Sequence, residues 1–446
     1  MTKYAVDTPK QRVAVIGSGP AGCAAAHRLS QQSYDVEVFE SASAVGGRTY
    51  TFRKDNFHLD TGAGFITNFY PRVFELAKSL NFSSDILEMH RVSGLNHDGR
   101  ATTLNVGSAL SFAQFPLLSW GDKLKMGLWT AKLTLKRKQY DIARPETLDS
   151  VDTQSIADYA RKNLSEDIYH FLIRPGIEPF WYFSCEEASE GLVLGLTAQA
   201  AGARFYFIDG GIDKVCSRLL GELNVHLNSP VMGINPTEQG IELSIGEEGQ
   251  TQTFDKVVVA TTASVASRLS EPLPDAWLSK NQRDFLSSQK YASNIHATFK
   301  IPRLSKDINV SSVFPCGPGR HAPAALSFHR KKHPGSDKDT HELVSLYLSD
   351  EKSKEMLQET DEALYLYTWK LAQTLYTGLP DQAEPFHLIR RNEAIPVHAP
   401  GRYRLATTFQ TEQLASDSPV RFCGDYLATA TIDGALATGF KISSDW

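Results

Sequence analysis

The chain has 446 residues, of which 41% are hydrophobic and 22% are charged, and its formal net charge at pH 7 is −5. This composition is typical of a globular protein with more than one domain, and the net charge gives no reason to expect a nucleic-acid partner. The five scattered cysteines contain no C-x-x-C pair, which indicates reduced thiols and argues against a disulfide framework or a zinc site.

A βαβ unit is predicted near the N-terminus. The apolar run 12–16 ends in a G-x-G-x-x-G turn, an alanine-rich helical segment follows, and a second apolar run ends in Glu40. In such a unit Gly17 permits the tight turn, Gly19 lets backbone approach a pyrophosphate, and Gly22 lets the helix pack on the strand. The helix N-terminus attracts phosphates, and Glu40 is placed to accept hydrogen bonds from ribose hydroxyls. The motif predicts a bound dinucleotide and leaves open whether it is NAD(P) or FAD.

Two more glycine-rich segments follow. In Gly46-Gly47-Arg48 the glycines expose backbone N–H groups and the arginine offers a planar fork that suits phosphate oxygens, although a simple turn before a strand is the alternative. The small residues 62–64 would let backbone approach a flat ligand closely. An amphipathic helix is then predicted over 71–80.

The segment 106–204 is predicted to be mostly helical, with Ser155 as an N-cap and an acid three residues later. Within it, 120–140 mixes large apolar residues with lysines. Two interpretations stay open: a helix pair packed over the substrate cavity, or a basic, aromatic-bearing surface that rests on an anionic membrane. Aromatic residues crowd into 180–183 and 205–207.

Strands are predicted at 224–227, 241–245, 256–261 and 295–301, and the apolar run 256–261 is typical of a buried parallel strand. A last strand leads into Gly424-Asp425 and a small-residue helix from about 432 to 442. The N-terminus of that helix would place positive charge beside a ligand, and tight core packing is an equally compatible role. Segments typical of a dinucleotide-binding domain thus alternate along the chain with helical and mixed segments. This alternation predicts an α/β protein of two discontinuous domains, with 1–105, 205–290 and 396–446 binding the dinucleotide and 106–204 and 291–395 binding substrate.

The order of these motifs resembles the flavin-containing amine oxidase superfamily, which includes monoamine and polyamine oxidases, protoporphyrinogen oxidase and phytoene desaturase-type enzymes. Gly210-Gly211 and Val231 add to the resemblance, which extends from residue 12 to about 443. It implies a Rossmann-like FAD domain, a substrate domain with a mixed sheet and helical cap, and non-covalent FAD. The FAD contacts that it implies are Gly17, Ser18, Gly19, Pro20, Ala21, Gly22, Glu40, Gly47, Arg48, Gly62, Ala63, Gly64, Phe65, Val231, Gly424, Asp425, Thr431, Ile432 and Ala435.

The resemblance also has departures. Amine oxidases of this group carry a lysine, linked through water to the flavin, where this chain aligns His296. This histidine is a candidate proton acceptor, or else a hydrogen-bonded core residue. The segment 427–432 lacks the aromatic cage of the amine oxidases, and 173–177, 394–397 and 424–426 look more like the porphyrinogen oxidase and desaturase branch.

The leading functional hypothesis is FAD-dependent removal of a hydride from a C–H bond next to nitrogen or a π-system, with oxygen or quinone as acceptor. The alternatives are a carbon–carbon desaturase or redox-neutral isomerase acting on a polyene or lipid, and a non-catalytic FAD- or NAD-binding protein. The substrate is expected to be a small apolar or aromatic molecule. Its candidate contacts are Arg174, Trp181, Tyr182, Phe205 and Tyr206, of which Arg174 would bind an anionic group unless it forms a structural ion pair.

Neither a metal site nor a membrane span is predicted. The spacing of the histidines in 321–341 (His321, His329, His333 and His341) matches no metal template. The segment Met1–Asp7 has no apolar leader, and no stretch has the length of a membrane-spanning helix. A cytoplasmic protein is expected, with peripheral contact to a membrane left open.

Overall fold

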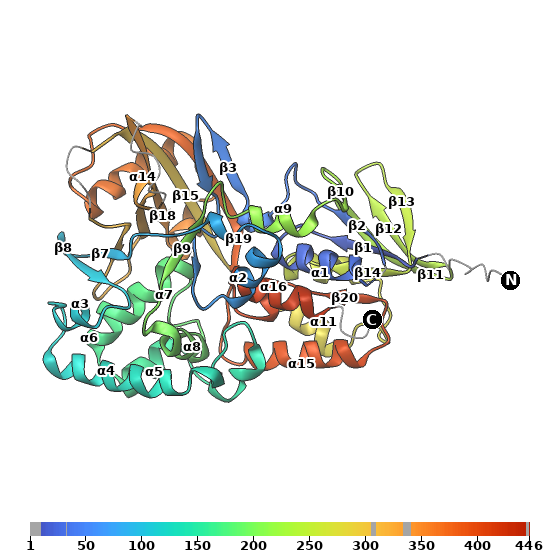
Figure 1. The fold of residues 1–446 in the computed structure, drawn as a ribbon, viewed down its shortest axis with the longest axis horizontal. Helices are drawn as coiled ribbons and strands as arrows, with labels where there is room; N and C mark the ends of the chain where they lie inside the picture. The colour runs from blue at the N-terminus through green and yellow to red at the C-terminus, as the bar shows by residue number, and fades with distance from the viewer. Residues whose placement is uncertain (1–9, 33, 305–308, 333–339, 443–445) are drawn as a thin grey trace.

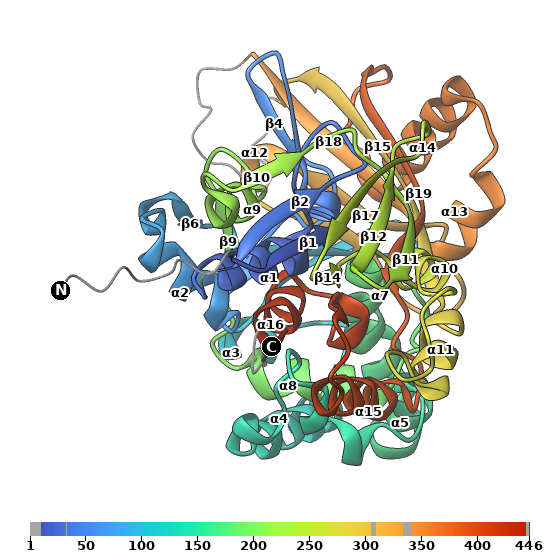
Figure 2. The same cartoon turned by 90° about the vertical axis from the view of Figure 1, so that its right-hand side faces the viewer.

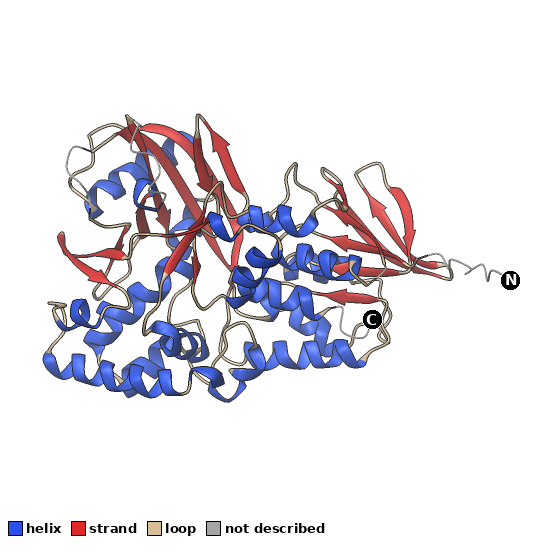
Figure 3. Ribbon diagram, in the orientation of Figure 1, coloured by secondary structure: helices blue, strands red, loops and turns tan. Residues whose placement is uncertain are grey.

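The computed structural model describes residues 10–32, 34–304, 309–332, 340–442 and 446. His333 and the segment Met1–Asp7 lie outside the described residues. Most of the helices follow the lower edge of the view in Figure 3, and the larger sheets lie above them. The predicted α/β class is confirmed.

A parallel five-stranded sheet forms the first part of the molecule (Figure 1). All its neighbouring strands run parallel. Its middle strand, β1, has Val13, Ala14 and Val15 fully buried, as expected for a strand covered on both faces. In spatial order the strands are β10 (Asn224–His226), β2 (Asp35–Phe39), β1 (Arg12–Ile16), β14 (Lys256–Val259) and β20 (Val420–Phe422).

The first and last long helices of the chain pack on each other beside this sheet. They are α1 (Pro20–Ser30) and α16 (Ile432–Lys441), which lie side by side in Figures 1 and 2. A Cβ on Gly439 would lie 2.1 Å from the carbonyl oxygen of Ala21, so only glycine permits this approach. The small residues of the predicted C-terminal helix therefore pack tightly in the core, as one of its two interpretations proposed.

A seven-stranded sheet forms the second part. Its strands, in order, are β19 (Glu384–Pro396), β15 (Tyr291–Pro302), β18 (His341–Leu348), β17 (Pro323–Phe328), β16 (Ser312–Pro315), β7 (Val92–His97) and β8 (Arg100–Asn105). Residues 92–105 lie within the segment 1–105 that is predicted to bind the dinucleotide, yet they belong to this sheet, because β7 pairs in parallel with β16 and β8 pairs with β7. Residues 92–105 thus extend the sheet that 291–395 mainly builds.

A helical layer packs on the seven-stranded sheet and accounts for most of 106–204. Ser155 caps α5 as predicted, because its side chain accepts a hydrogen bond from the backbone N–H of Asp158. None of the described helices is both long and apolar enough to cross a bilayer. The layer contains α3 (Ala109–Ala113), α4 (Trp120–Leu135), α5 (Ile156–Asn163), α6 (Glu166–Ile168), α7 (Arg174–Trp181) and α8 (Glu190–Ala200).

Smaller elements complete the fold. Three small antiparallel sheets are present among the described residues. One pairs β3 (Thr51–Lys54) with β4 (Phe57–Asp60), and a second places β5 (Ile66–Thr67) and β6 (Ile86–Glu88) on either side of β9 (Phe205–Ile208). The third consists of β11 (Val231–Thr237), β12 (Gly240–Ile245) and β13 (Gln250–Phe254). The remaining helices are α2 (Pro71–Ser79), α9 (Lys214–Leu220), α10 (Ala263–Leu269), α11 (Lys280–Ser287), α12 (His329–Lys332), α13 (Asp350–Met356), α14 (Asp361–Leu375) and α15 (Arg402–Ala415).

Candidate cofactor and substrate site

A cavity of about 1490 Å³ begins at the carboxyl ends of β1, β2, β14 and β20 and continues between the seven-stranded sheet and the helical layer. The crevice outside the carboxyl ends of parallel strands is where open α/β sheets bind ligands. All the predicted FAD contacts line this cavity except Gly22. The structure therefore brings together segments from both ends of the chain, and their contact with FAD stays a prediction.

The glycine-rich turn has the geometry of a phosphate site. Gly17 has φ +102°, and its N–H donates to the carbonyl oxygen of Phe39 at 2.8 Å. A Cβ on Gly22 would lie 2.0 Å from the carbonyl oxygen of Gly17, which explains why Gly22 lies against the strand and outside the cavity. A Cβ on Gly19, in contrast, would meet no atom within 4 Å. Gly19 is also the N-cap of α1 and offers no capping side chain, so the first N–H groups of the helix remain available to an anion.

Glu40 is buried at the end of β2 and is anchored to the glycine-rich turn. Its Oε2 accepts hydrogen bonds from the N–H of Ser18 at 2.9 Å and from the Ser18 hydroxyl at 2.7 Å. Its Oε1 accepts from the N–H of Ala42 at 2.9 Å. These contacts fix the carboxylate at the cavity wall, in the position that a ribose-binding acid requires. The sequence motif did not reveal that Glu40 also holds Ser18.

Arg48 joins three of the predicted segments. Its Nη2 lies 2.7 Å from Oδ1 of Asp425, and its Nη1 donates to the carbonyl oxygen of Ala394 at 3.1 Å. Burial is the largest single effect on the pKa of Arg48 and acts to lower it, but Asp425, together with Tyr291 and Glu393, raises the pKa overall. A Cβ on Gly62 would lie 2.0 Å from the Arg48 carbonyl oxygen, so a glycine is required there. One side of the guanidinium is therefore held by Asp425, and its remaining edge lines the cavity.

The N-terminus of α16 ends at the cavity. Thr431 is its N-cap and accepts from the N–H of Gly434 at 2.9 Å. The preceding residue, Ala430, is held on both sides: its N–H donates to Nε2 of His398 at 3.1 Å, and its carbonyl oxygen accepts from Nε1 of Trp181 at 3.1 Å. Burial lowers the pKa of His398 to about 3, with a smaller contribution from Arg402, so the ring is a neutral acceptor near pH 7.

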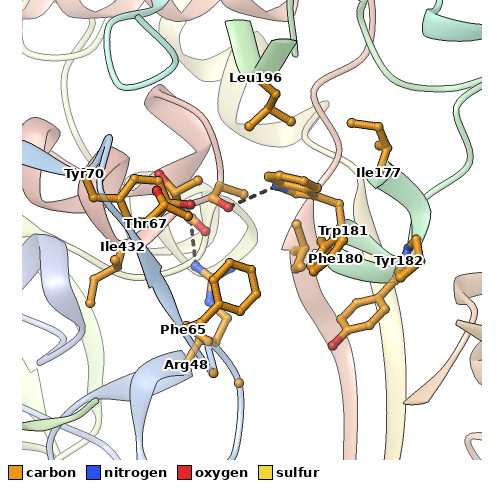
Figure 4. Close-up of a pocket in the computed structure, with 18 of the residues that line it drawn as sticks. Arg48, Phe65, Thr67, Tyr70, Ile177, Phe180, Trp181, Tyr182, Leu196 and Ile432 are labelled. Atoms are coloured by element: carbon orange, nitrogen blue, oxygen red, sulfur yellow. Dashed lines mark hydrogen bonds and ion pairs between the residues drawn. The ribbon is translucent and has the colours of Figure 1, made fainter. Parts of the chain in front are cut away.

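Aromatic side chains form the substrate end of the cavity. The ring of Phe65 makes edge contacts with Phe180 at 5.6 Å and with Phe205 at 5.4 Å between centroids. Tyr182 is stacked on Tyr347 with centroids 6.4 Å apart. It has φ +64°, a conformation that is uncommon for a bulky residue and occurs at functional sites. In Figure 4, Trp181 and Tyr182 lie on one side of the view and Tyr70 and Ile432 on the other, with Phe65 and Arg48 between them.

Two predicted substrate residues lie elsewhere. Arg174 does not line the cavity, because its guanidinium lies 3.2 Å from Glu178 and donates to the carbonyl oxygen of Gly319 at 2.8 Å. It forms the structural ion pair that was the alternative interpretation. Tyr206 is also absent from the cavity wall, since successive residues of a strand point to opposite faces. Phe205 faces the cavity, whereas the ring of Tyr206 packs on Phe74 at 5.4 Å.

His296 lies on β15 behind the cavity wall. It is 1% exposed, and its ring stacks on Tyr347 with centroids 4.2 Å apart. Its Nε2 lies 3.0 Å from Oγ1 of Thr298 and 3.2 Å from Oγ of Ser345. This placement corresponds to the hydrogen-bonded core histidine, the alternative to a catalytic role.

The sequence reasoning missed Asn294 and Arg391, which are directly opposite each other on β15 and β19 and both line the cavity. Arg391 donates to the carbonyl oxygen of Thr61 and to its Oγ1, the latter at 3.1 Å, and no described carboxylate pairs with it. Burial lowers the pKa of Arg391, and the positive charge of Arg48 lowers it further. Nearby Tyr182 acts in the opposite direction. Strand alternation was the available signal: of the two successive arginines, Arg390 turns outward to Asp361 and Arg391 turns inward.

Comparison with known proteins gives a consistent result. Residues 20–445 match the family model described as flavin containing amine oxidoreductase. The chain is 22% identical to a 15-cis-phytoene desaturase of Synechococcus elongatus, over 96% of this chain and 94% of that protein. A candidate protoporphyrinogen oxidase of Exiguobacterium has the same fold, with a TM-score of 0.75, 17% identity, and coverage of 97% of this chain and 98% of the other. Cyclohexylamine oxidase of Brevibacterium oxydans also has this fold, with a TM-score of 0.72, 16% identity, and coverage of 97% of this chain and 98% of the other. The chain therefore belongs to the flavin-containing amine oxidoreductase family and is an oxidoreductase with FAD as its cofactor.

Proposed function

We propose that the protein oxidises a small apolar or aromatic molecule at a C–H bond next to nitrogen or a π-system. The observation that carries this proposal is the continuity of the cavity. It runs without interruption from Gly17 and Glu40, the predicted cofactor end, to the aromatic residues around Phe65. A substrate that lies against these rings would be oriented and shielded from water, which is what hydride transfer requires of the protein.

The fit of FAD rests on the residues that line the cavity. The open space above Gly19 and the uncapped start of α1 suit the pyrophosphate, Glu40 suits the ribose, and Gly62 with the N-terminus of α16 suits the flat ring. FAD supplies the acceptor for the hydride equivalent when it is bound. The five cysteines are all buried and none of them lines the cavity, which supports non-covalent binding.

Arg391 is the side chain that we propose to recognise a polar group of the substrate. The side chain is partly buried in the cavity wall, and a cation that is partly removed from water without a carboxylate partner is unfavourable unless something compensates it. Two of its N–H groups are used by Thr61, and the rest of the guanidinium borders the cavity beside Asn294. We therefore expect an apolar substrate that carries one carboxylate or carbonyl oxygen, bound by this arginine in place of Arg174.

A desaturase or isomerase acting on a polyene or lipid is the second candidate. It is favoured by the similarity to a phytoene desaturase over 96% of the chain and by the apolar character of the side chains from α7 and α8 in the cavity, among them Ile177, Val193 and Leu196. A polyene without polar groups would leave Arg391 uncompensated, and for that reason we place this candidate second.

The test is anaerobic mixing of the holoenzyme with amines, polyamines, amino acids, porphyrinogens and polyenes, read as bleaching of the flavin absorbance. Bleaching followed by reoxidation with oxygen or a quinone would support the oxidase and identify its acceptor. Turnover of a polyene without net bleaching would support the isomerase instead. A purified protein without flavin absorbance, which also fails to bind added FAD, would refute both.

A further inference from the structure

The five most exposed large hydrophobic side chains of the described residues lie together on α3 and α4. We call them, with the cations around them, the α3–α4 surface. Their relative exposures range from 65% to 89%, whereas the other exposed large hydrophobic side chains reach at most 59%. The five are Leu110, Trp120, Leu124, Leu128 and Leu135. An exposed apolar patch of this kind marks an interaction site more often than an isolated exposed leucine does.

The spacing on α4 places these side chains in one stripe. Trp120, Leu124 and Leu128 are four residues apart, and Leu135 follows two turns later on the same face. The opposite face of the helix is already used, because Leu133 is buried and Trp129 packs against the same core. The outer stripe therefore has no partner within the described chain.

Cations border the stripe although the chain as a whole has a net charge of −5. Lys132, Lys136, Arg137 and Lys138 are exposed, and no described carboxylate forms an ion pair with any of them. Lys123 lies over the ring of Trp120 and donates to the carbonyl oxygen of Ala113 at 2.8 Å, which links α4 to α3. The acid on this helix, Asp122, is bound by Ser119 and Ser165.

The cavity opens next to this stripe. Some of the residues that line it are exposed here and mark this opening: Gly107, Ala109, Gly127, Ala131, Leu135, Ala201 and Gly202. The cavity is also exposed at the predicted adenine end, where Met232 on β11 lines it. Leu135 belongs both to the stripe and to the mouth. Figure 1 shows α3, α4 and α8 together at the lower left, on the side of the molecule away from the predicted adenine end at β11.

We propose that the α3–α4 surface docks on an anionic lipid bilayer, with the mouth of the cavity facing the lipid. An apolar stripe flanked by lysines is the pattern of a helix that lies in a membrane interface, with apolar side chains in the acyl region and cations among the headgroups. A second copy of the chain fits less well, because a two-fold contact through this surface would bring the same cations against one another. The entry of an apolar substrate from the lipid rests on the proposed function. Docking of the α3–α4 surface on the bilayer does not depend on that function.

The test is co-sedimentation of the holoenzyme, without substrate, with vesicles of equal parts phosphatidylcholine and phosphatidylglycerol. Wild type is expected to sediment with these vesicles, to bind pure phosphatidylcholine less, and to dissociate as salt is added. Leu124→Gln/Leu128→Gln should lower the partition coefficient at least roughly tenfold. Lys132→Gln/Lys136→Gln should lower it by about fivefold for each cation removed. The matched control is Leu227→Gln/Leu366→Gln, which changes two exposed leucines elsewhere and should bind as wild type does.

A second measurement reports the orientation. Vesicles with brominated acyl chains should quench part of the tryptophan emission, and Trp120→Phe should remove that part while binding persists. The proposal is overturned if the wild-type holoenzyme stays in the supernatant at low salt. It is equally overturned if the Leu227/Leu366 control loses binding as strongly as the α4 variants, or if light scattering shows a dimer that Leu124→Gln/Leu128→Gln dissociates.

Discussion

Gly19 and Gly22 are three residues apart in one motif, yet alanine at Gly22 should mainly lower stability, whereas alanine at Gly19 should mainly lower the affinity for FAD. At Gly22 the added methyl group would lie 2.0 Å from the carbonyl oxygen of Gly17 and 3.0 Å from Cβ of Ala260. Helix α1 would have to move away from the sheet, at a cost of about 1–3 kcal/mol. Helix propensity alone would favour alanine at this position by about 1 kcal/mol. The clash is with backbone, so it should dominate and destabilise the apoprotein by up to about 2 kcal/mol, or about 2 °C in Tm for a chain of this length.

At Gly19 the methyl group meets no protein atom within 4 Å. The apoprotein of Gly19→Ala should therefore unfold within about 1 kcal/mol of wild type, the small loss arising because alanine is a poorer N-cap. The same methyl group points to the space expected for the pyrophosphate. The affinity for FAD should fall about 10- to 100-fold, which corresponds to about 1.4–2.8 kcal/mol.

The assay has two arms. Thermal unfolding of the apoprotein, followed by circular dichroism, measures stability without the contribution of bound cofactor. Quenching of FAD fluorescence measures affinity. Gly127→Ala, in an open position on α4, controls for helix propensity and should be neutral or stabilising. A stabilised Gly22→Ala, or a Gly19→Ala that binds FAD as wild type does, would refute the reasoning.

Three further predictions concern the substrate end and its support. Arg391→Met should raise KM for carboxylate substrates by about 10- to 100-fold relative to neutral analogues, as expected for loss of a charged hydrogen bond. Steady-state kinetics with phenylalanine and phenethylamine test this prediction. An equal change in KM for both compounds would contradict it. Because the pKa of His398 is lowered to about 3 in the folded state, the unfolded chain binds a proton below about pH 6.5 that the folded chain does not. This residue should thus lower the free energy of unfolding by about 2 kcal/mol between pH 7 and pH 5. Urea unfolding checks this, because the free energy of unfolding of His398→Gln should differ less between these two pH values than that of wild type. His296→Ala should lower the free energy of unfolding by about 1–3 kcal/mol because it leaves a buried cavity and removes the hydrogen bonds to Thr298 and Ser345, whereas stopped-flow flavin reduction should stay within about twofold of wild type.

The sequence was most informative where a backbone requirement leaves only one residue type. Gly17 and Gly22 were placed correctly on the turn and against the strand because their roles follow from a positive φ and a backbone contact. The apolar run 256–261 predicted a buried parallel strand, because a short continuous apolar run is typical of a strand covered on both faces. The structure has this strand as β14, paired in parallel with β1 and β20. Local patterns of this kind predict both the first βαβ unit and the fold class.

The substrate end could not be read in the same way. Whether an aromatic residue of a strand faces a cavity or the core depends on the strand register, which a one-residue difference inverts, as Phe205 and Tyr206 illustrate. Arg174 pairs with Glu178 and with carbonyl groups more than 140 residues away in the chain, and Arg391 pairs with none of the carboxylates that the structure describes. The pair with Glu178 has the i,i+4 spacing of a helix and is visible in the sequence, whereas the long-range contacts are decided by tertiary packing and have no signature in the local sequence.

The contact between α1 and α16 has a consequence for synthesis of the protein. The helix that opens the phosphate site is made first, and its neighbour, which carries Gly439 against Ala21, follows about 400 residues later. At about 5–20 residues per second, the intervening chain takes roughly 20–80 s to make. During that time the nascent N-terminal unit exposes the face of α1 that the last helix later covers. The complete flavin site should therefore form only after α16 has been made, and a variant truncated before α16 should be an apoprotein prone to aggregation.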